Sequence, residues 1–293
     1  MNILLLGAQG QLGHELVPLL STRGTLEAVS RDRLDVADLD QVRALLGRAR
    51  PRLIVNATAY NQVDLAESEP QAALRVNAEM VSVLGDYAVR ERAALVHYST
   101  DFVFDGTKGA PYVETDPPNP LSAYGRSKLA GERALAEMEA PALVFRTAWV
   151  YSLRRKSFVS MMLKLAREKK EMKVVSDQVG SPTWCRDLAR ATASIVDWLG
   201  ADPAPRAAEA RGVYHAAGEG ACSRFDLAKA ALELDPKRHG QVVERLVPVS
   251  ASEFPAPAAR PANAALDCRK MRERFGVSML PWKEALAEAL TTE

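Results

Sequence analysis

Tyr124 and Lys128 are the residues of this sequence whose types and spacing most directly suggest chemistry. They stand four positions apart in Tyr124-Gly125-Arg126-Ser127-Lys128, so on a helix they share one face. An ammonium close to a phenol favours the phenolate and lowers the tyrosine pKa from its usual value of about 10. Tyr124 would then be a general acid able to protonate a carbonyl oxygen as a hydride arrives. Taken alone, the spacing is common, and most such pairs are a surface tyrosine packed over a lysine stem.

Hydroxyl side chains follow an apolar run that is typical of a buried strand. Ser99 ends the run Ala94–Ser99 and Thr100 follows it, which places both at the carboxyl edge of the sheet. Ligands of open α/β sheets bind at that edge. The Thr100 hydroxyl could hydrogen-bond a substrate oxygen and stabilise its developing charge. The alternative is a Ser/Thr turn that merely ends the strand.

A glycine-rich turn, Gly7-Ala8-Gln9-Gly10-Gln11-Leu12-Gly13, connects the first apolar run to an amphipathic segment. Glycines allow a tight turn and let backbone N–H groups approach a pyrophosphate at the positive end of a helix. The spacing is GxxGxxG and not the GxGxxG of the standard fingerprint. Because the turn lies between a predicted strand and a predicted helix, it indicates a dinucleotide site.

The end of the second predicted strand bears on which dinucleotide is bound. NAD enzymes usually place an acid there for the ribose 2′-hydroxyl, whereas this strand ends in Ser30-Arg31-Asp32. The Arg31 guanidinium suits a 2′-phosphate, although Asp32 beside it could still serve a 2′-hydroxyl. The sequence therefore favours NADPH, with NADH left as a possibility.

The elements that must position these residues are short apolar runs alternating with amphipathic segments. Buried strands are predicted at Asn2–Leu6, Thr25–Ser30, Leu53–Asn56, Ala94–Ser99 and Ala142–Arg146. Helices are predicted at Gln11–Ser21, Leu39–Ala49, Asn77–Arg92 and Tyr124–Glu139. Such alternation predicts an α/β fold with a parallel, doubly wound sheet of Rossmann type.

The second half of the chain is less regular. Helices are predicted at Ser157–Lys169, Trp184–Leu199, Ser223–Leu234 and Pro281–Leu290, and strands at Lys173–Val175, Val213–His215 and Val242–Pro248. Gly200–Arg211 is expected to be a solvated connection, and the proline-rich Ser252–Ala265 a loop. We expect a cofactor-binding domain over residues 1–150. Residues 151–293 would form a smaller substrate-binding region, with segments that cross back to the first sheet.

Composition excludes several classes of partner. The 293 residues include 38 Lys and Arg against 37 Asp and Glu, a net charge of +1. This balance gives no electrostatic basis for a nucleic-acid platform or a membrane-surface binder. No run approaches the roughly 18 apolar residues of a membrane span.

The sulfur and imidazole side chains give no sign of a disulfide framework or a metal site. Three distant cysteines, Cys185, Cys222 and Cys268, fit idle thiols in a reducing compartment, so a cytoplasmic location is expected. The four histidines are scattered without metal-ligand spacing, and no metal is expected.

Taken together, the motifs resemble the extended branch of the short-chain dehydrogenase/reductase superfamily, and within it the dTDP-4-dehydrorhamnose reductase family. Ser99–Gly106 (STDFVFDG) resembles the family's STDYVFDG, and Asn56–Pro70 (NATAYNQVDLAESEP) its NAAAYTAVDKAESEP. Asp177–Thr183 (DQVGSPT) resembles its DQxGxPT loop, and Arg146–Tyr151 (RTAWVY) its RTSWVYG. The similarity covers nearly the whole chain and is looser in the C-terminal half. Phe102 and Ala148 replace the usual Tyr and Ser.

The resemblance implies roles for the matched positions. Thr100, Tyr124 and Lys128 would be catalytic, with Tyr124 as proton donor, Lys128 on the nicotinamide ribose and Thr100 orienting the keto oxygen. The remaining cofactor-binding residues would be Gly7, Gln9, Gly10, Gln11, Leu12, Asp35, Val36, Ala57, Thr58, Ala59 and Tyr60, in addition to Arg31. Val63, Trp149 and Arg260 would join Thr100 in binding the sugar nucleotide, where a guanidinium suits a diphosphate.

The activity implied is reduction of the C4 keto group of dTDP-4-dehydro-L-rhamnose to dTDP-L-rhamnose, the last step of dTDP-rhamnose biosynthesis. One alternative is a 4-ketoreductase for another nucleotide deoxysugar. A second is a non-catalytic, reductase-like regulatory subunit similar to that of methionine adenosyltransferase. A monomer or homodimer is expected, with a small-molecule nucleotide sugar as the partner.

Overall fold

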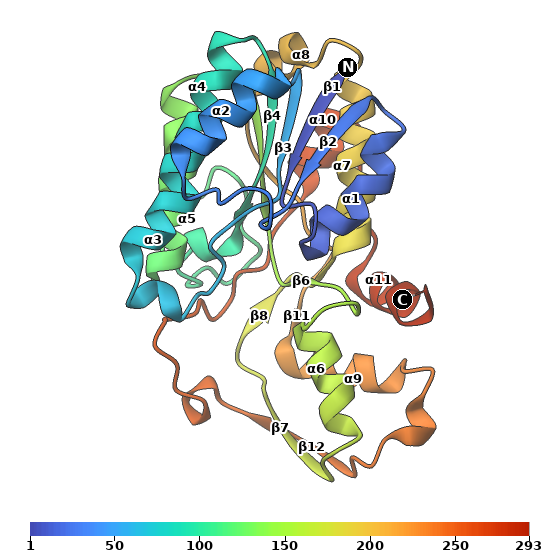
Figure 1. Ribbon diagram of the computed structural model, residues 1–293. Helices are drawn as coiled ribbons and strands as arrows, with labels where there is room; N and C mark the ends of the chain where they lie inside the picture. Colours follow the sequence, from blue (N-terminus) through green and yellow to red (C-terminus); the bar gives the residue numbers. More distant parts are fainter. Residues whose placement is uncertain (293) are drawn as a thin grey trace.

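The computed structural model describes residues 1–292, and its centre is a six-stranded sheet (Figure 1). In spatial order the strands are β10 (Gly212–His215), β5 (Ala142–Thr147), β4 (Ala94–Thr100), β3 (Leu53–Asn56), β1 (Asn2–Leu6) and β2 (Thr25–Val29). Every neighbouring pair is parallel. The strand order reverses between β1 and β3, the kind of switch point at which open sheets bind ligands. The predicted doubly wound α/β fold is confirmed.

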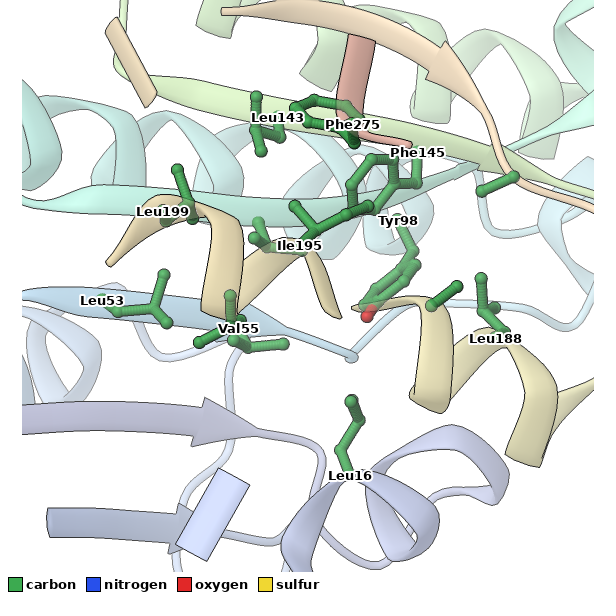
Figure 2. Packing of buried hydrophobic residues seen from close by; sticks show 14 of the residues in the cluster. Leu16, Leu53, Val55, Tyr98, Leu143, Phe145, Leu188, Ile195, Leu199 and Phe275 are labelled. Atoms are coloured by element: carbon green, nitrogen blue, oxygen red, sulfur yellow. The ribbon is translucent and has the colours of Figure 1, made fainter. Parts of the chain in front are cut away.

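Helices cover both faces of this sheet (Figure 1). The first face carries α1 (Gln11–Ser21), α7 (Cys185–Leu199) and α10 (Arg269–Phe275). The second carries α2 (Leu39–Ala49), α4 (Met80–Arg90) and α5 (Ala123–Glu137). Figure 2 shows Leu188, Ile195 and Leu199 of α7 lying among side chains of β3, β4 and β5. Two apolar layers therefore hold the sheet, and one of them depends on helices from late in the sequence.

The helix predicted at Asn77–Arg92 begins earlier and is interrupted. It starts as α3 (Pro70–Leu74), where proline occupies the first turn, and passes through a π-helical turn (Arg75–Glu79) into α4. The buried Asn77 side chain lies in that turn. It accepts a hydrogen bond from the Tyr60 N–H at 2.9 Å and donates to the Ser127 hydroxyl at 2.9 Å. The predicted start was wrong because a polar residue inside the helix serves tertiary contacts that periodicity does not reveal.

The smaller part of the molecule lies beyond the carboxyl ends of the strands (Figure 1). It contains three two-stranded pairs: β6 (Val150–Tyr151) with β9 (Thr183–Trp184), β7 (Glu171–Val175) with β12 (Arg245–Val249), and β8 (Val179–Gly180) with β11 (Cys222–Ser223). Its helices are α6 (Phe158–Ala166), α9 (Arg224–Glu233) and α11 (Trp282–Thr292). Single 3₁₀ turns lie at Leu65–Glu67, Asp101–Val103, Arg238–Gly240 and Ala251–Glu253. None of the helices described over residues 1–292 has the length and apolar character needed to cross a bilayer.

The segment Gly200–Arg211, expected to be a solvated connection, contains the helix α8 (Pro203–Glu209). Proline stands at its start, where the missing N–H costs nothing. Ala204 and Ala207 are buried, and Ala207 belongs to the core on the α7 face. The prediction was wrong because Pro and Ala were interpreted as linker composition, whereas here they start a short helix and pack it.

Candidate active site

A cavity of about 1310 Å³ opens at the carboxyl edge of the sheet, between the sheet and the smaller part of the molecule. All the residues proposed from the sequence for catalysis, cofactor binding and substrate binding line it. They are Gly7, Gln9, Gly10, Gln11, Leu12, Arg31, Asp35, Val36, Ala57, Thr58, Ala59, Tyr60, Val63, Thr100, Tyr124, Lys128, Trp149 and Arg260. The fold thus brings residues from distant parts of the chain around one space, and their individual roles stay predictions.

The glycine turn contributes Gly7 and residues 9–12 to the lining of the cavity. Gly7 has a φ of +86°, and a Cβ there would lie 2.7 Å from the Ala57 carbonyl oxygen. A Cβ on Gly13 would lie 2.0 Å from the Gly7 oxygen, so α1 can approach the turn only with glycine at this position. Helix α1 begins after Gly10 without a side-chain cap or an acidic residue in its first turn. Its N-terminus therefore suits the pyrophosphate of a dinucleotide.

Beside the turn, the two residues that bear on the choice of cofactor lie differently. Arg31 is exposed and lines the cavity, whereas Asp32 does not belong to the lining. The Ser30 hydroxyl donates a hydrogen bond to the Asp32 carboxylate, which lowers the pKa of Asp32. Of the two side chains only the cation lines the cavity, and a guanidinium there would fit a 2′-phosphate better than a free 2′-hydroxyl.

Tyr124 and Thr100 are positioned by the ends of their own elements. Tyr124 is the second residue of α5, whose start is capped by the Ser122 hydroxyl accepting the Gly125 N–H at 3.1 Å. A Cβ on Gly125 would lie 2.2 Å from the Phe102 carbonyl oxygen, so this glycine lets α5 approach the turn after β4. Thr100 caps that turn by accepting the Phe102 N–H at 3.2 Å. Both hydroxyls are thereby held on one wall of the cavity.

The pKa of Tyr124 differs from the sequence-based expectation. Burial raises it to about 12, opposed by a hydrogen bond with the Thr100 side chain, and the charge of Asp101 raises it further. The expected lowering of this pKa is wrong for the free protein, because desolvation of the phenol is the largest effect and raises it. Tyr124 is therefore a fully protonated phenol at neutral pH, the state that a proton donor requires.

Lys128 is buried one turn further along α5, with a side chain 1% exposed. Its Nζ donates to the Tyr98 carbonyl oxygen at 2.6 Å and lies 3.4 Å from Nε2 of His97. Burial lowers the pKa of Lys128 to about 8, and the Glu132 carboxylate opposes this shift. Near pH 8, the charged and the uncharged form of the Lys128 amine are therefore both populated.

Two lining residues, Asp101 and Arg224, were not proposed from the sequence. Asp101 is 2% exposed, and its Oδ2 has no hydrogen-bond partner among the described residues. Burial raises the pKa of Asp101 to about 7. Asp101 stands inside the quoted STDFVFDG motif, which could have indicated it, whereas no local pattern marks Arg224. Arg224 begins α9 directly after β11, and both the pairing of β11 with β8 and the bond of its N–H to the Gln178 carbonyl hold it beside the cavity.

Trp149 lies between Arg224 and a glycine. The Arg224 guanidinium carbon is 3.7 Å from the centroid of the Trp149 ring, a close cation–π contact. A Cβ on Gly180 would lie 2.5 Å from the same ring. Trp149 itself has a φ of +45°, which is unusual for a residue with a side chain. Its ring is thus fixed by its neighbours on both sides, at the border of the cavity.

Arg260, the other cation at this end, already has protein partners. Its Nη2 donates to Asp64 Oδ2 at 2.9 Å, and its Nη1 to the Ala258 carbonyl at 3.1 Å. For Arg224, by contrast, no salt bridge to a carboxylate is found within residues 1–292. The two arginines therefore differ in how freely they can meet an anionic ligand.

Over residues 1–292, no group of three or more His, Cys, Asp or Glu side chains is arranged to hold a metal ion. The polar side chains that line the cavity carry hydroxyls, carboxamides, an amine, guanidinium groups and two carboxylates. This set suits hydrogen bonding and proton transfer to an anionic organic ligand.

Comparison with known proteins finds relatives along the whole chain. Residues 1–293 match the family model described as RmlD substrate binding domain. A dTDP-4-dehydrorhamnose reductase of Burkholderia thailandensis is 44% identical over 98% of this chain and 97% of the relative. A solved dTDP-4-dehydrorhamnose reductase from Clostridium acetobutylicum is 33% identical, with a TM-score of 0.89 over 99% of both chains. One from Bacillus anthracis, in complex with NADP, is 31% identical with the same TM-score and coverage.

Proposed function

Because the chain belongs to the RmlD substrate binding domain family, we propose that it reduces dTDP-4-dehydro-L-rhamnose to dTDP-L-rhamnose with NADPH. The observation that carries this function is the wall formed by Thr100, Tyr124 and Lys128 in a cavity that also reaches the glycine turn. A carbonyl group and a dinucleotide can therefore be held within one space. The relative that was solved with NADP and the position of Arg31 both favour NADPH as the reductant.

In this reaction the residues of the protein would protonate the C4 oxygen and orient the substrate. NADPH, when bound, supplies the hydride that goes to the C4 carbonyl carbon. Tyr124 would give its phenolic proton to the C4 oxygen, which it can do because its pKa keeps it protonated at neutral pH. Thr100, which shares a hydrogen bond with Tyr124, would hold the same oxygen. Lys128 would bind the nicotinamide ribose and return a proton toward Tyr124 after each turnover.

The nucleotide part of the substrate carries a diphosphate, which needs cationic partners. Arg224 and Arg260 both line the end of the cavity away from the glycine turn. Arg260 was proposed from the sequence, but part of its hydrogen-bonding capacity is used by Asp64. We assign the larger share of diphosphate binding to Arg224, because Arg260 already forms a salt bridge with Asp64, whereas no salt bridge of Arg224 is found among the described residues.

The test is NADPH oxidation in the presence of an enzymatically generated pool of dTDP-4-keto-6-deoxyhexose. Wild-type protein should turn over, and Tyr124→Phe should lower kcat by about 10²- to 10⁴-fold, the range lost with a general acid. Tyr87→Phe is the matched control, since Tyr87 is a buried tyrosine outside the cavity that donates to the Pro51 carbonyl. The control should keep wild-type kcat.

Other outcomes would point elsewhere. Turnover with a different sugar nucleotide only would indicate a related 4-ketoreductase. No turnover by wild type, together with tight NADPH binding, would indicate a regulatory role. A monomer or homodimer and a cytoplasmic location complete the proposal, and sedimentation and cell fractionation test them. No observation in the structure favours either alternative function.

A further inference from the structure

His97 is a buried residue that contacts the proposed catalytic lysine and has no role assigned above. It lies in β4, is 0% exposed, and is in register with Asn56 of β3. Its Nδ1 is 3.0 Å from the Asn56 amide nitrogen, and its Nε2 is 3.4 Å from Lys128 Nζ. One imidazole thus connects a buried amide on one side with the Lys128 amine on the other.

The hydrogen bonds of Asn56 decide which ring nitrogen of His97 carries the proton. The Asn56 carbonyl oxygen accepts from the Thr58 N–H at 3.1 Å and from the Thr58 hydroxyl at 2.6 Å. A backbone N–H can only donate, so the amide cannot be turned round without losing that bond. Its nitrogen therefore donates to Nδ1 of His97. Burial holds the pKa of His97 well below its usual value, so the ring is neutral and its proton is on Nε2.

The Nε2–H group then faces Lys128, and this restricts the protonation state that the Lys128 amine can adopt. A neutral amine can accept this hydrogen through its lone pair while it donates to the Tyr98 carbonyl oxygen. An ammonium has no lone pair, so it would meet the His97 N–H donor to donor. Glu132 on the same helix also acts on Lys128: it favours the charged form and is itself paired with Arg146 of β5. Tyr124 lies one turn earlier on this helix.

We propose that Asn56 and His97 are positioning residues that hold the Lys128 amine against the Tyr98 carbonyl and favour its uncharged form. They act through Lys128 and do not contact the reacting atoms. The proposal rests on the proposed function, because it assigns Lys128 a part in proton transfer to Tyr124. It predicts that the protonation state of Lys128 depends on the direction of these hydrogen bonds as well as on burial.

Asn56→Asp tests the direction of these hydrogen bonds. A carboxylate can still accept from Thr58, but it must also accept from His97, so the ring proton would move to Nδ1. Nε2 would then present a lone pair to Lys128 and favour the ammonium. We expect the decline of kcat/KM above about pH 8, where Lys128 loses its charge, to move up by about one pH unit.

Two further variants separate this role from simple packing. His97→Leu removes the N–H that opposes the ammonium and should move the same decline to higher pH. His215→Leu is the matched control, since His215 is fully buried, packs on Phe104 and lies outside the cavity. It should leave the pH of the decline unchanged. If Asn56→Asp and His97→Leu keep the wild-type pH profile while remaining folded, the proposal is wrong.

A spectroscopic measurement keeps the test independent of turnover. Long-range ¹H–¹⁵N spectra of histidine-labelled protein distinguish the two neutral tautomers, and the chain has only four histidines. Wild type should show the Nε2–H tautomer at His97, and Asn56→Asp the Nδ1–H tautomer. The opposite result in wild type would overturn the proposal even if the reductase activity holds. The expected spectra without any turnover would instead count against the proposed function alone.

Discussion

At the residue scale, Arg224 and Arg260 line the same cavity but differ in their protein partners. Arg260 stands in a recognisable Arg-Pro-Ala-Asn segment and was proposed from the sequence, yet it bonds Asp64 and the backbone. Arg224 has no local motif, but burial lowers its pKa to about 10, and its guanidinium lies over the rings of Trp149 and Phe158. The sequence could indicate Tyr124 and Lys128 as a candidate pair because the YxxxK spacing is local. It could not supply Arg224, whose placement depends on strand pairing.

Arg224→Gln is expected to weaken binding of dTDP by about tenfold or more, because a charged hydrogen bond contributes about 1.5–3 kcal/mol. Binding of thymidine, which lacks the diphosphate, should be almost unchanged. Isothermal titration calorimetry with both ligands measures the difference.

Arg245→Gln is the control for a general loss of positive charge, since Arg245 is exposed and lies outside the cavity. Arg224→Lys should recover part of the affinity for dTDP. If Arg224→Gln weakens thymidine and dTDP equally, the arginine only supports the ring of Trp149, and our assignment of the diphosphate is wrong.

At the element scale, α5 carries the two proposed catalytic residues Tyr124 and Lys128, and several close contacts fix it on the sheet. Glu132, one turn after Lys128, forms a buried ion pair with Arg146 of β5 at 2.6 Å. Gly131 allows α5 to approach the π-helical turn, where a Cβ would lie 2.2 Å from the Asn77 carbonyl oxygen. The sequence predicted α5 from its periodicity. It did not predict the π-helical turn, because that turn exists to satisfy the contacts of Asn77 with other elements.

Two glycine substitutions in helices should therefore have opposite effects on stability. Gly131→Ala should destabilise the protein by several kcal/mol, since backbone must shift to admit the methyl group. Gly47→Ala, in the exposed face of α2 with nothing within 4 Å of the new Cβ, should stabilise it by about 0.4–1 kcal/mol. Urea denaturation of both variants provides the free energies of unfolding. Equal effects of the same sign would show that α5 can move away from its neighbour.

At the scale of the whole molecule, the parts proposed for cofactor and substrate share one core. The apolar cluster on the α1 face takes Leu188 and Ile195 from α7, Tyr214 from β10 and Phe275 from α10. All of these come after residue 150, and β10 completes the central sheet. The alternation of strands and helices was enough to predict the sheet. It could not show how much of the core is supplied by segments from the second half, and the boundary near residue 150 stays a prediction.

A fragment of residues 1–150 should consequently fail to fold as a cooperative unit. It would lack α7 and α10, which together with α1 cover one face of the sheet, so it should bind an apolar dye and show no sharp urea transition, in contrast to the full chain. Adding residues 151–293 should restore the transition. Circular dichroism during denaturation provides the measurement, and a sharp transition in the fragment alone would mean that the first half carries its own sufficient core.

The place of Trp149 also gives the molecule an optical reporter. Of the four tryptophans, it alone belongs to the lining of the cavity, and its indole is held between a guanidinium and a glycine. Indole emission overlaps the absorption band of reduced nicotinamide. Binding of a reduced nicotinamide cofactor in the cavity should therefore quench the fluorescence of Trp149, and the occupancy of the site could be followed in real time without a label.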